Sequence, residues 1–301
     1  MADQDDIRDE LAELWAFHTR RMRPTTDPRD LMDRVAFSQA PPIRVAQCNA
    51  CTHIFRNPRE RGITGLYGSE EVDRDALDGL FRAQRATFTR QVRRLGEIVP
   101  SRANGLEIGS YVGAFLAAAR DAGWQFQGYD VNPAAVAFAR DRGLDVRAGS
   151  IDDVPPGKSY DVVCIWNCFE QLADVRSVIR TASSLLHENG VITIRVPNAQ
   201  YWASMRSRMR GLLAPLVRPA LAQNNLLTFP YRNGFTPTSL RMLCERNGFR
   251  ILKSVGEFSL PTGSAGAPRW ALLEGRVVHR IVSALGPVTG APWIEAYARK
   301  I

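Results

Sequence analysis

The stretch Leu106-Glu107-Ile108-Gly109-Ser110-Tyr111-Val112-Gly113-Ala114-Phe115 decides the fold class of this 301-residue chain. An apolar segment that carries an acid ends in a glycine-bearing turn, and a helical pattern follows at once. Gly109 and Gly113 let the backbone approach a ligand where any side chain would clash. Because ligands of open parallel sheets bind beyond the carboxyl ends of the strands, we expect a ligand site at this turn.

Strands and helices alternate on both sides of this stretch. We expect strands over 105–108, 126–129, 144–146, 161–165, 191–195, 249–255 and 293–298, and helices over 112–122, 133–140, 175–186 and 236–247. This alternation predicts an α/β fold with a Rossmann-like, seven-stranded, mostly parallel sheet and helices on both faces.

The N-terminal part lies outside this alternation. Helices are expected over 5–22, 27–35 and 73–98, and two short strands over 43–46 and 52–55. We therefore expect a helical cap over residues 1–72 and a main domain over 73–301. Insertions at about 198–233 and 257–291 interrupt the main domain and are expected to form a helical lid.

A second acid, Asp130, follows the next expected strand, 21 residues after Gly109. A carboxylate there can accept hydrogen bonds from the hydroxyl groups of a ribose. The turn lacks the G-x-G-x-x-G pattern that places a pyrophosphate on a helix N-terminus, which disfavours a dinucleotide. The acid before the turn favours a ligand with a positive amino group and no phosphate, such as S-adenosylmethionine.

Residues 105–197 resemble a class I S-adenosylmethionine-dependent methyltransferase. The first motif is Glu107–Gly113, and later segments, among them Tyr160-Asp161-Val162-Val163, Phe235-Thr236-Pro237 and Gly248-Phe249, occur in the family's order. Ser150 stands where the family usually has an acid, and Gln171 stands where it usually has His. The resemblance implies that S-adenosylmethionine is held by Glu107, Gly109, Tyr111, Gly113, Asp130, Val131, Ser150, Ile151, Asp152 and Asn167.

The acceptor side is expected beyond the fourth and fifth strands of the sheet. Transfer from an activated sulfonium mainly needs alignment and exclusion of water, and an O-methylation also needs a base. Glu170, Tyr201 and Tyr231 are the candidate catalytic residues, although surface pairing of Glu170 and ordinary packing of the tyrosines would explain them as well.

Cys48-x-x-Cys51 resembles one half of a zinc knuckle that precedes the domain in some relatives. The other cysteine pair is missing, and His53 and His18 do not stand at standard spacings. We therefore expect a degenerate knuckle without metal; a zinc site and a redox pair are the alternatives.

The net charge of +8 is unevenly distributed. Residues 198–301 hold 14 basic and 4 acidic side chains, whereas residues 101–197 hold 9 and 11. The sequence contains no recognised nucleic-acid module, so nucleic acid is not an expected partner. The excess lies largely in the two insertions, which could form a lid, a basic amphipathic contact with a membrane, or helices packed on the core.

These patterns predict methyl transfer to a small-molecule acceptor: a natural-product, sugar or lipid-linked intermediate, with an anionic one favoured by the charge. A non-catalytic adapter of the same fold and a nicotinamide-dependent oxidoreductase are the alternatives. The acidic start of the chain and five scattered cysteines favour the cytoplasm. The oligomeric state is not predicted.

Overall fold

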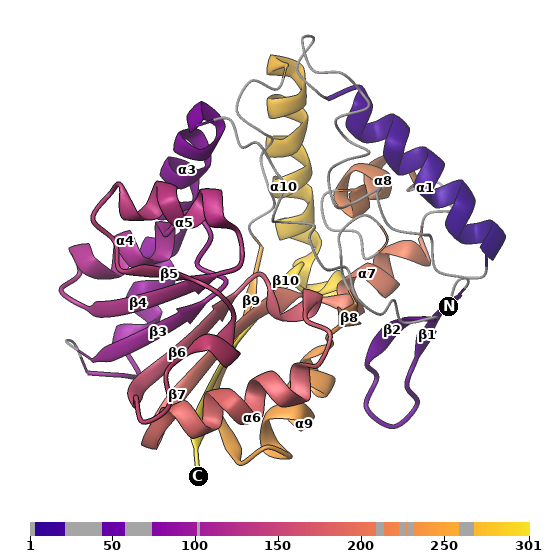
Figure 1. Cartoon of the computed structure of the whole chain (residues 1–301). Coiled ribbons are helices and arrows are strands. Elements are labelled where there is room, and N and C mark those ends of the chain that lie inside the picture. The colour runs from indigo at the N-terminus through magenta and orange to yellow at the C-terminus, as the bar shows by residue number, and fades with distance from the viewer. Residues whose placement is uncertain are drawn as a thin grey trace.

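The protein is described from a computed structural model, which covers residues 4–21, 44–57, 74–100, 103–208, 214–222, 227, 232–258 and 268–301. Its main feature is a seven-stranded sheet (Figure 1). In spatial order the strands are β5 (Val146–Ala148), β4 (Gln125–Asp130), β3 (Asn104–Ile108), β6 (Tyr160–Trp166), β7 (Leu186–Pro197), β10 (Trp293–Lys300) and β9 (Phe249–Glu257). Strand β10 runs antiparallel to β7 and β9, and the other pairings are parallel. The predicted fold class is confirmed.

Helices cover both faces of this sheet (Figure 1). On one face lie α3 (Arg74–Gly96), α4 (Ala114–Asp121) and α5 (Pro133–Arg140), and on the other lie α6 (Val175–Leu185) and α9 (Pro237–Glu245). The central strands are buried on both sides: Val162 and Cys164 of β6 face α3 and α4, while Val163 and Ile165 face α6. This double burial explains their nearly continuous apolar sequence.

Local signals in the sequence set the helix boundaries. The Asn132 side chain accepts hydrogen bonds from the backbone N–H groups of Ala134 and Ala135, and Pro133 occupies the first helical position of α5. Thr236 and Ser239 form a reciprocal capping box at the start of α9. The Asp174 side chain caps α6 as Asn132 caps α5, by accepting hydrogen bonds from the backbone N–H groups of Arg176 and Ser177. These caps lie at the predicted helix starts to within one residue.

One predicted turn differs in detail. The sequence favours a turn at Asn189-Gly190, between the expected helix over 175–186 and the expected strand over 191–195, but β7 begins at Leu186 and includes both residues. Leu186 pairs with Tyr160 and Val191 with Val162, so residues 187–190 bulge out of the pairing, and Asn189 adopts a positive φ of 62°. The bulge accommodates the extra residues, so the side chains of β7 after it alternate between the two faces of the sheet in register with those of β6.

The N-terminal region and the insertions build a second layer beside the sheet. It contains α1 (Gln4–Thr19), α7 (Ala199–Arg206), α8 (Ala214–Ala222) and α10 (Arg269–Thr289), with an antiparallel sheet of β1 (Arg44–Gln47), β2 (Ile54–Asn57) and β8 (Asn233–Gly234). We call it the accessory layer. Its apolar side chains share one core, to which the N-terminal region contributes Ile7 and Ile54 and the insertions contribute Trp202, Leu221 and Val282. The expected helix over 27–35 lies outside the described residues.

Ion pairs join the N-terminal helix to both insertions. Arg206 of α7 contacts Glu10 at 2.8 Å, Arg218 of α8 contacts Glu13 at 3.2 Å, and Arg21 contacts Glu274 of α10 at 2.6 Å. Part of the positive charge of the last third is therefore balanced by acids of α1. None of the described helices has the length and apolar character needed to cross a bilayer.

Candidate cofactor and acceptor site

The turn between β3 and α4 is shaped by residues in the left-handed region. Gly109 and Gly113 have φ of 73° and 71°, and Tyr111 between them has 44°. The N–H groups of Gly109 and Ser110 both donate to the Tyr129 carbonyl of β4, at 2.8 and 3.1 Å. A Cβ on Gly109 would lie 2.5 Å from the Cys168 sulfur. Both the backbone angle and the neighbour therefore require glycine at position 109.

Two buried carboxyl groups lie at this edge. Asp130 accepts hydrogen bonds from the N–H groups of Tyr111 and Asn132, at 2.7 and 2.8 Å, and burial nevertheless raises its pKa. Glu107 is buried, and its Oε2 atom has no hydrogen-bond partner. Burial, with the nearby Asp130, raises the pKa of Glu107 well above its ordinary value. The Glu107 Oε2 atom therefore lacks a donor or a positive charge, which a ligand could supply.

The residues after β4 and β5 form the next part of the rim. Val131 is 56% exposed directly beside the buried Asp130, and the Gly149 N–H donates to the Asp130 carbonyl at 2.9 Å. Ser150 forms a capping box with Asp153 that begins a short 3-10 helix, Ile151–Asp153. Ile151 is buried in the main core, and the Asp152 side chain is exposed. The exposed Val131 and Asp152 can therefore face a ligand, whereas the Ser150 hydroxyl caps the 3-10 helix.

Asn167 follows β6 and lies at the same edge. It adopts a φ of 60°, its N–H donates to the Arg195 carbonyl at 3.0 Å, and its Oδ1 accepts from the Arg195 guanidinium. Arg195 is buried at the end of β7, with Glu295 at 3.5 Å and the Trp293 ring 4.1 Å from its guanidinium carbon. Sequence reasoning missed Arg195, although a basic residue in the apolar run 191–197 was the available signal.

Glu170 lies in a 3-10 turn, Phe169–Gln171, and is almost fully buried. Its Oε1 accepts a hydrogen bond from Gln171 at 3.4 Å, and its Oε2 has no partner. Burial raises its pKa to about 7. The main chain of Glu170 also accepts hydrogen bonds from Arg232 and Asn233, at 3.0 and 3.3 Å. Glu170 therefore lies where the large sheet meets the accessory layer, and not on a helix surface.

Cys168 links these acidic groups in space. Burial raises the pKa of its thiol, and Glu170, Asp130 and Glu107 raise it further in that order. The thiol also donates to the Ile108 carbonyl at 3.4 Å. The three carboxyl groups thus lie near enough to the Cys168 thiol to influence it, although they come from three different strand ends.

The two predicted tyrosines do not join this group. Tyr201 packs inside the core of the accessory layer, where burial raises the pKa of its phenol and leaves its hydroxyl without a partner. A phenol in this environment stays protonated at neutral pH and is a poor base. Tyr231 lies outside the described residues. Asn198, another residue at the strand end, caps α7 and donates to the Ala291 carbonyl at 2.8 Å.

Cys48 and Cys51 lie in the turn between β1 and β2. Hydrogen bonds from the backbone of Cys51 and Ala50 lower the pKa of the Cys48 thiol. The His53 ring packs against Phe235 at 5.0 Å between centroids, and His18 lies against the Ala222 carbonyl at 3.2 Å. In the described part of the chain, no cluster of three or more His, Cys, Asp or Glu side chains is placed to hold a metal. The absence of a metal stays a prediction.

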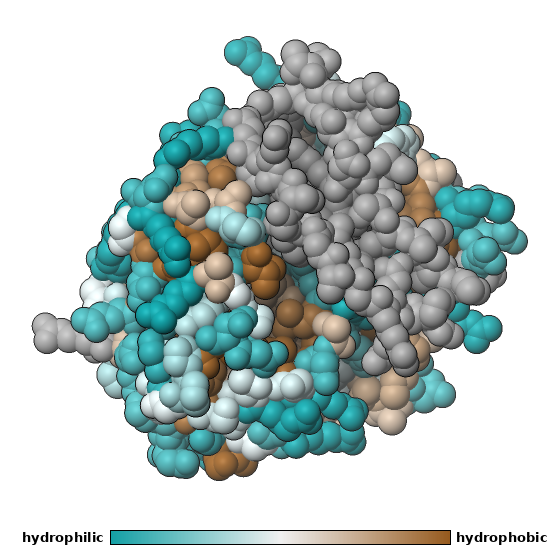
Figure 2. All heavy atoms as spheres, in the orientation of Figure 1, coloured by the Kyte–Doolittle hydropathy of each residue, from teal (hydrophilic) through white to brown (hydrophobic). Residues whose placement is uncertain are grey.

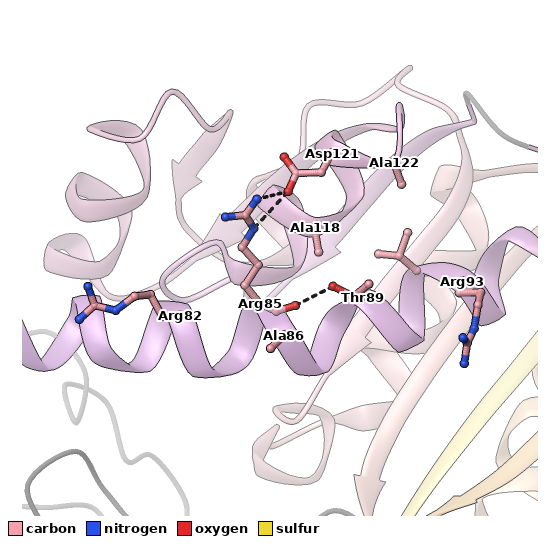
Figure 3. A pocket seen from close by; sticks show the side chains of 9 residues that line it. Arg82, Arg85, Ala86, Thr89, Arg93, Ala118, Asp121 and Ala122 are labelled. Atoms are coloured by element: carbon pink, nitrogen blue, oxygen red, sulfur yellow. Dashed lines mark hydrogen bonds and ion pairs between the residues drawn. The ribbon is translucent and has the colours of Figure 1, made fainter.

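A surface hollow of about 630 Å³ lies elsewhere, between α3 and α4 (Figure 3). Arg82, Arg85 and Arg93 of α3 line it, and Arg85 points toward Asp121, with which it pairs. None of the predicted site residues lines the hollow. Its α4 residues lie beyond the turn at Gly113, toward the far end of that helix. It is therefore separate from the candidate site.

Comparison with known families decides the class. The model of a methyltransferase domain family matches residues 80–254, which is more than half of the chain. The chain belongs to this methyltransferase family. The match spans every cofactor residue named above and Glu170, and it favours methyl transfer over a nicotinamide-dependent reaction.

Solved structures show the same fold at low identity. The methyltransferase is similar to a chain from the complex between the Haloferax volcanii Trm112 methyltransferase activator and a methyltransferase, with 17% identity, a TM-score of 0.51, and coverage of 77% of this chain and 99% of that one. It also matches an S-adenosylmethionine-dependent methyltransferase from Archaeoglobus fulgidus, with 19% identity, a TM-score of 0.49, and coverage of 74% of this chain and 97% of that one. A third match, an S-adenosylmethionine-dependent methyltransferase from Mesorhizobium loti, has 17% identity, a TM-score of 0.49, and coverage of 74% of this chain and 100% of that one. A search of curated protein sequences finds no match.

As a member of this family, the methyltransferase uses S-adenosylmethionine as its cofactor. The residues present suit it: Glu107 has an unpartnered oxygen for a cationic group, Asp130 is placed for hydroxyl donors, and Val131 offers an exposed apolar side chain. Figure 2 shows mainly hydrophilic side chains over the outer surface of the sheet half, with hydrophobic ones near its middle.

Proposed function

We propose that the enzyme methylates a small-molecule acceptor, a natural-product, sugar or lipid-linked intermediate, with Glu170 as the general base. The observation that carries this proposal is the buried Glu170 carboxyl with one unpartnered oxygen beside the group around Gly109. A buried acid with an unpartnered oxygen costs stability, so a role in the reaction best explains its position.

S-adenosylmethionine, when bound, supplies an electrophilic methyl group on a sulfonium. We assign Glu107 to its cationic end, Asp130 to its ribose, and Val131 with Asp152 to its adenine. The burial of Glu107 supports this because a buried carboxylate is strongly stabilised by a positive partner. The Gly109 turn supports it because a backbone without Cβ admits a ligand closely.

Glu170 would accept the proton of an acceptor hydroxyl or amine. Its pKa of about 7 suits this role, since a base works best when its pKa is near the working pH. Gln171 donates to both the Asn167 carbonyl and Glu170, at 3.1 and 3.4 Å, and thereby holds the carboxyl in place. Tyr231, which lies outside the described residues, remains a second candidate for the base.

The accessory layer is proposed to form the wall of the acceptor pocket. Residues of the cap and of both insertions share one core, and β8 brings Asn233 to the Glu170 and Leu172 carbonyls, the latter at 2.8 Å. This supports a lid over the acceptor side. The division into a cap (1–72) and a main domain (73–301) also stays a proposal, because the two parts are joined through this core. The five free thiols support a cytoplasmic enzyme.

The test is transfer of radiolabelled methyl groups from S-adenosylmethionine into extracts that are then separated into low-mass, lipid and macromolecular fractions. Label in the low-mass or lipid fraction, lost in Glu170→Gln while calorimetric cofactor binding is retained, supports the proposal. Label confined to protein or nucleic acid contradicts the acceptor class. Full activity of Glu170→Gln contradicts the role of the base.

A further inference from the structure

Helix α10 (Arg269–Thr289) has two dissimilar sides. One side packs into the accessory layer through Ala271, Val278 and Val282, of which the last two belong to its core. The other side points to solvent and carries three large apolar side chains: Trp270 is 50% exposed, Leu273 61% and Val277 48%. Their spacing of three and four residues places them on one face.

The same face is positively charged. Arg269, Arg276 and Arg280 are exposed, and they lie seven and four residues apart beside the apolar side chains. Among the described residues, none of these guanidinium groups pairs with a carboxylate. The acid between them, Glu274, turns away to Arg21, which holds it at 2.6 Å. The exposed face of α10 is therefore apolar and cationic, and α10 itself contributes no acid to it other than the paired Glu274.

The residues that follow α1 adjoin this surface, with Arg21 paired to Glu274 and Arg20 exposed. Arg21 also lies over the Trp270 ring at 5.1 Å. Figure 1 shows the C-terminal end of α1 near the start of α10, whereas the acidic start of α1 lies at its opposite end. The acids of α1 that could repel an anionic partner are thus directed away from this face.

We propose that this face of α10 binds the surface of a membrane that contains anionic phospholipids. Trp, Leu and Val side chains partition into the headgroup region, while arginines extend their charged ends to lipid phosphates. Exposed apolar groups alone would suit many partners, but the three arginines, which pair with no carboxylate of the described residues, select an anionic, extended surface. The proposal does not depend on the acceptor or on Glu170.

The first experiment uses the full chain with vesicles of phosphatidylcholine, with and without phosphatidylserine. Binding by co-sedimentation should require phosphatidylserine and fall as salt is raised. The triple variant R269Q/R276Q/R280Q should bind about a hundredfold more weakly, because each arginine near such a surface contributes roughly fivefold. The control R176Q/R180Q/R241Q removes the same charge from exposed positions of α6 and α9 and should keep most of the binding.

The second experiment tests insertion. Brominated lipid should quench the fluorescence of the wild type, and Trp270→Phe should lose most of this quenching while it still binds. Substitution L273Q/V277Q should weaken binding roughly tenfold. Circular dichroism verifies that these surface variants remain folded.

Absence of binding to phosphatidylserine vesicles at low salt would overturn the proposal. So would equal weakening by the two arginine triples, which would indicate non-specific attraction by net charge. A raised KM for the acceptor in L273Q/V277Q, with vesicle binding unchanged, would instead assign the face to the lid of the acceptor pocket.

Discussion

Two buried carboxyl groups, Glu107 and Glu170, distinguish this site at the scale of single residues. Each keeps one oxygen without a partner, and burial raises the pKa of each. Replacing a carboxyl that is kept for stability should lower the stability of the protein, whereas replacing one that is kept for function should raise the stability and lower the activity. Substitution by the amide of the same shape separates these two explanations.

We expect Glu107→Gln to stabilise the free protein and to weaken cofactor binding. The amide removes a charge that is buried beside Asp130, so the free energy of unfolding should rise by about 1–2 kcal/mol. Loss of the anionic partner should weaken binding of S-adenosylmethionine at least tenfold. Thermal unfolding and calorimetry measure the two effects. Glu245→Gln, at an exposed position of α9, is the control and should change neither.

We expect the activity of the wild type to rise with pH through about 7, where Glu170 loses its proton. Stability should change in the opposite direction. The folded pKa is raised above the ordinary 4.5, so the stabilising protonation is fully present below pH 4.5 and is lost as pH rises through about 7. The stability advantage of Glu170→Gln over the wild type should therefore grow as pH rises from 4.5 to about 7 and reach up to about 3 kcal/mol above that range. Equal pH profiles of unfolding would contradict a buried carboxyl at this position.

Substitution of Gly109 is a poorer test of cofactor binding than the position of this residue in the motif indicates. From the sequence, Gly109→Val is expected to abolish binding and leave the fold intact. The structure places Cys168 where the new Cβ would lie, and φ at this position is positive, so valine would strain the turn itself. Asp130→Ala, for which the sequence makes the same prediction, is the cleaner variant.

At the scale of elements, α1 is held to the insertions by charge as well as by apolar packing. Arg206 contacts Glu10 at 2.8 Å and Asp6 at 3.7 Å, and Glu10 is buried. An amphipathic helix gains most of its stability from such tertiary contacts rather than from its own propensity. Arginines of the insertions therefore serve partly as structural partners of α1, which the sequence left open.

We expect Arg206→Gln to destabilise the accessory layer by about 2–3 kcal/mol, because it removes the guanidinium charge that pairs with the buried Glu10 carboxylate. Arg8→Gln is the control, since its pair with Asp5 is exposed and is worth less than about 1 kcal/mol. Hydrogen exchange of α1 and α7 amides reports the loss. A double-mutant cycle with Glu10→Gln should give a coupling energy clearly above zero; additive effects would show that the pair contributes nothing.

At the scale of the whole molecule, a buried polar cluster joins α3 to three strands. Glu295 of β10 accepts hydrogen bonds from Gln91 at 2.7 Å, Arg94 at 2.7 Å and Tyr297 at 3.1 Å, and Arg195 lies 3.5 Å away. Arg94 also contacts Glu257 of β9 at 2.7 Å. Through Arg195, this cluster extends to Asn167 at the candidate site, so the covering helix and the site share one set of contacts.

We expect Glu295→Gln to lower the free energy of unfolding by about 3 kcal/mol or more, because it leaves buried guanidinium groups short of negative charge. Denaturant unfolding measures the loss. Glu188→Gln is the control, since Glu188 is exposed and lies 3.6 Å from Lys300. A loss for Glu295→Gln no larger than that of the control would show that the cluster is not a stabilising unit.

Much of the large sheet could be predicted from the sequence because its signals are local. Two-residue and 3.6-residue periodicities, the caps at Asn132 and Thr236, and the glycines of the Gly109 turn act within a few residues of each other. Acids at the carboxyl ends of neighbouring parallel strands lie at the same edge of the sheet, so the sequence alone could place Glu107 and Asp130 in one site.

The burial of Glu170, the role of Arg195 and the accessory layer depend on contacts that the local sequence does not encode. Arg206 meets Glu10 across 196 residues, and Gln91 meets Glu295 across 204. The sequence by itself determined the strand and helix pattern, the cofactor turn and an unequal charge distribution. Only the tertiary structure decided which arginines are neutralised, which carboxyl groups lose their water, and which face of α10 stays exposed, because desolvation and long-range pairing exist only once distant segments are packed together.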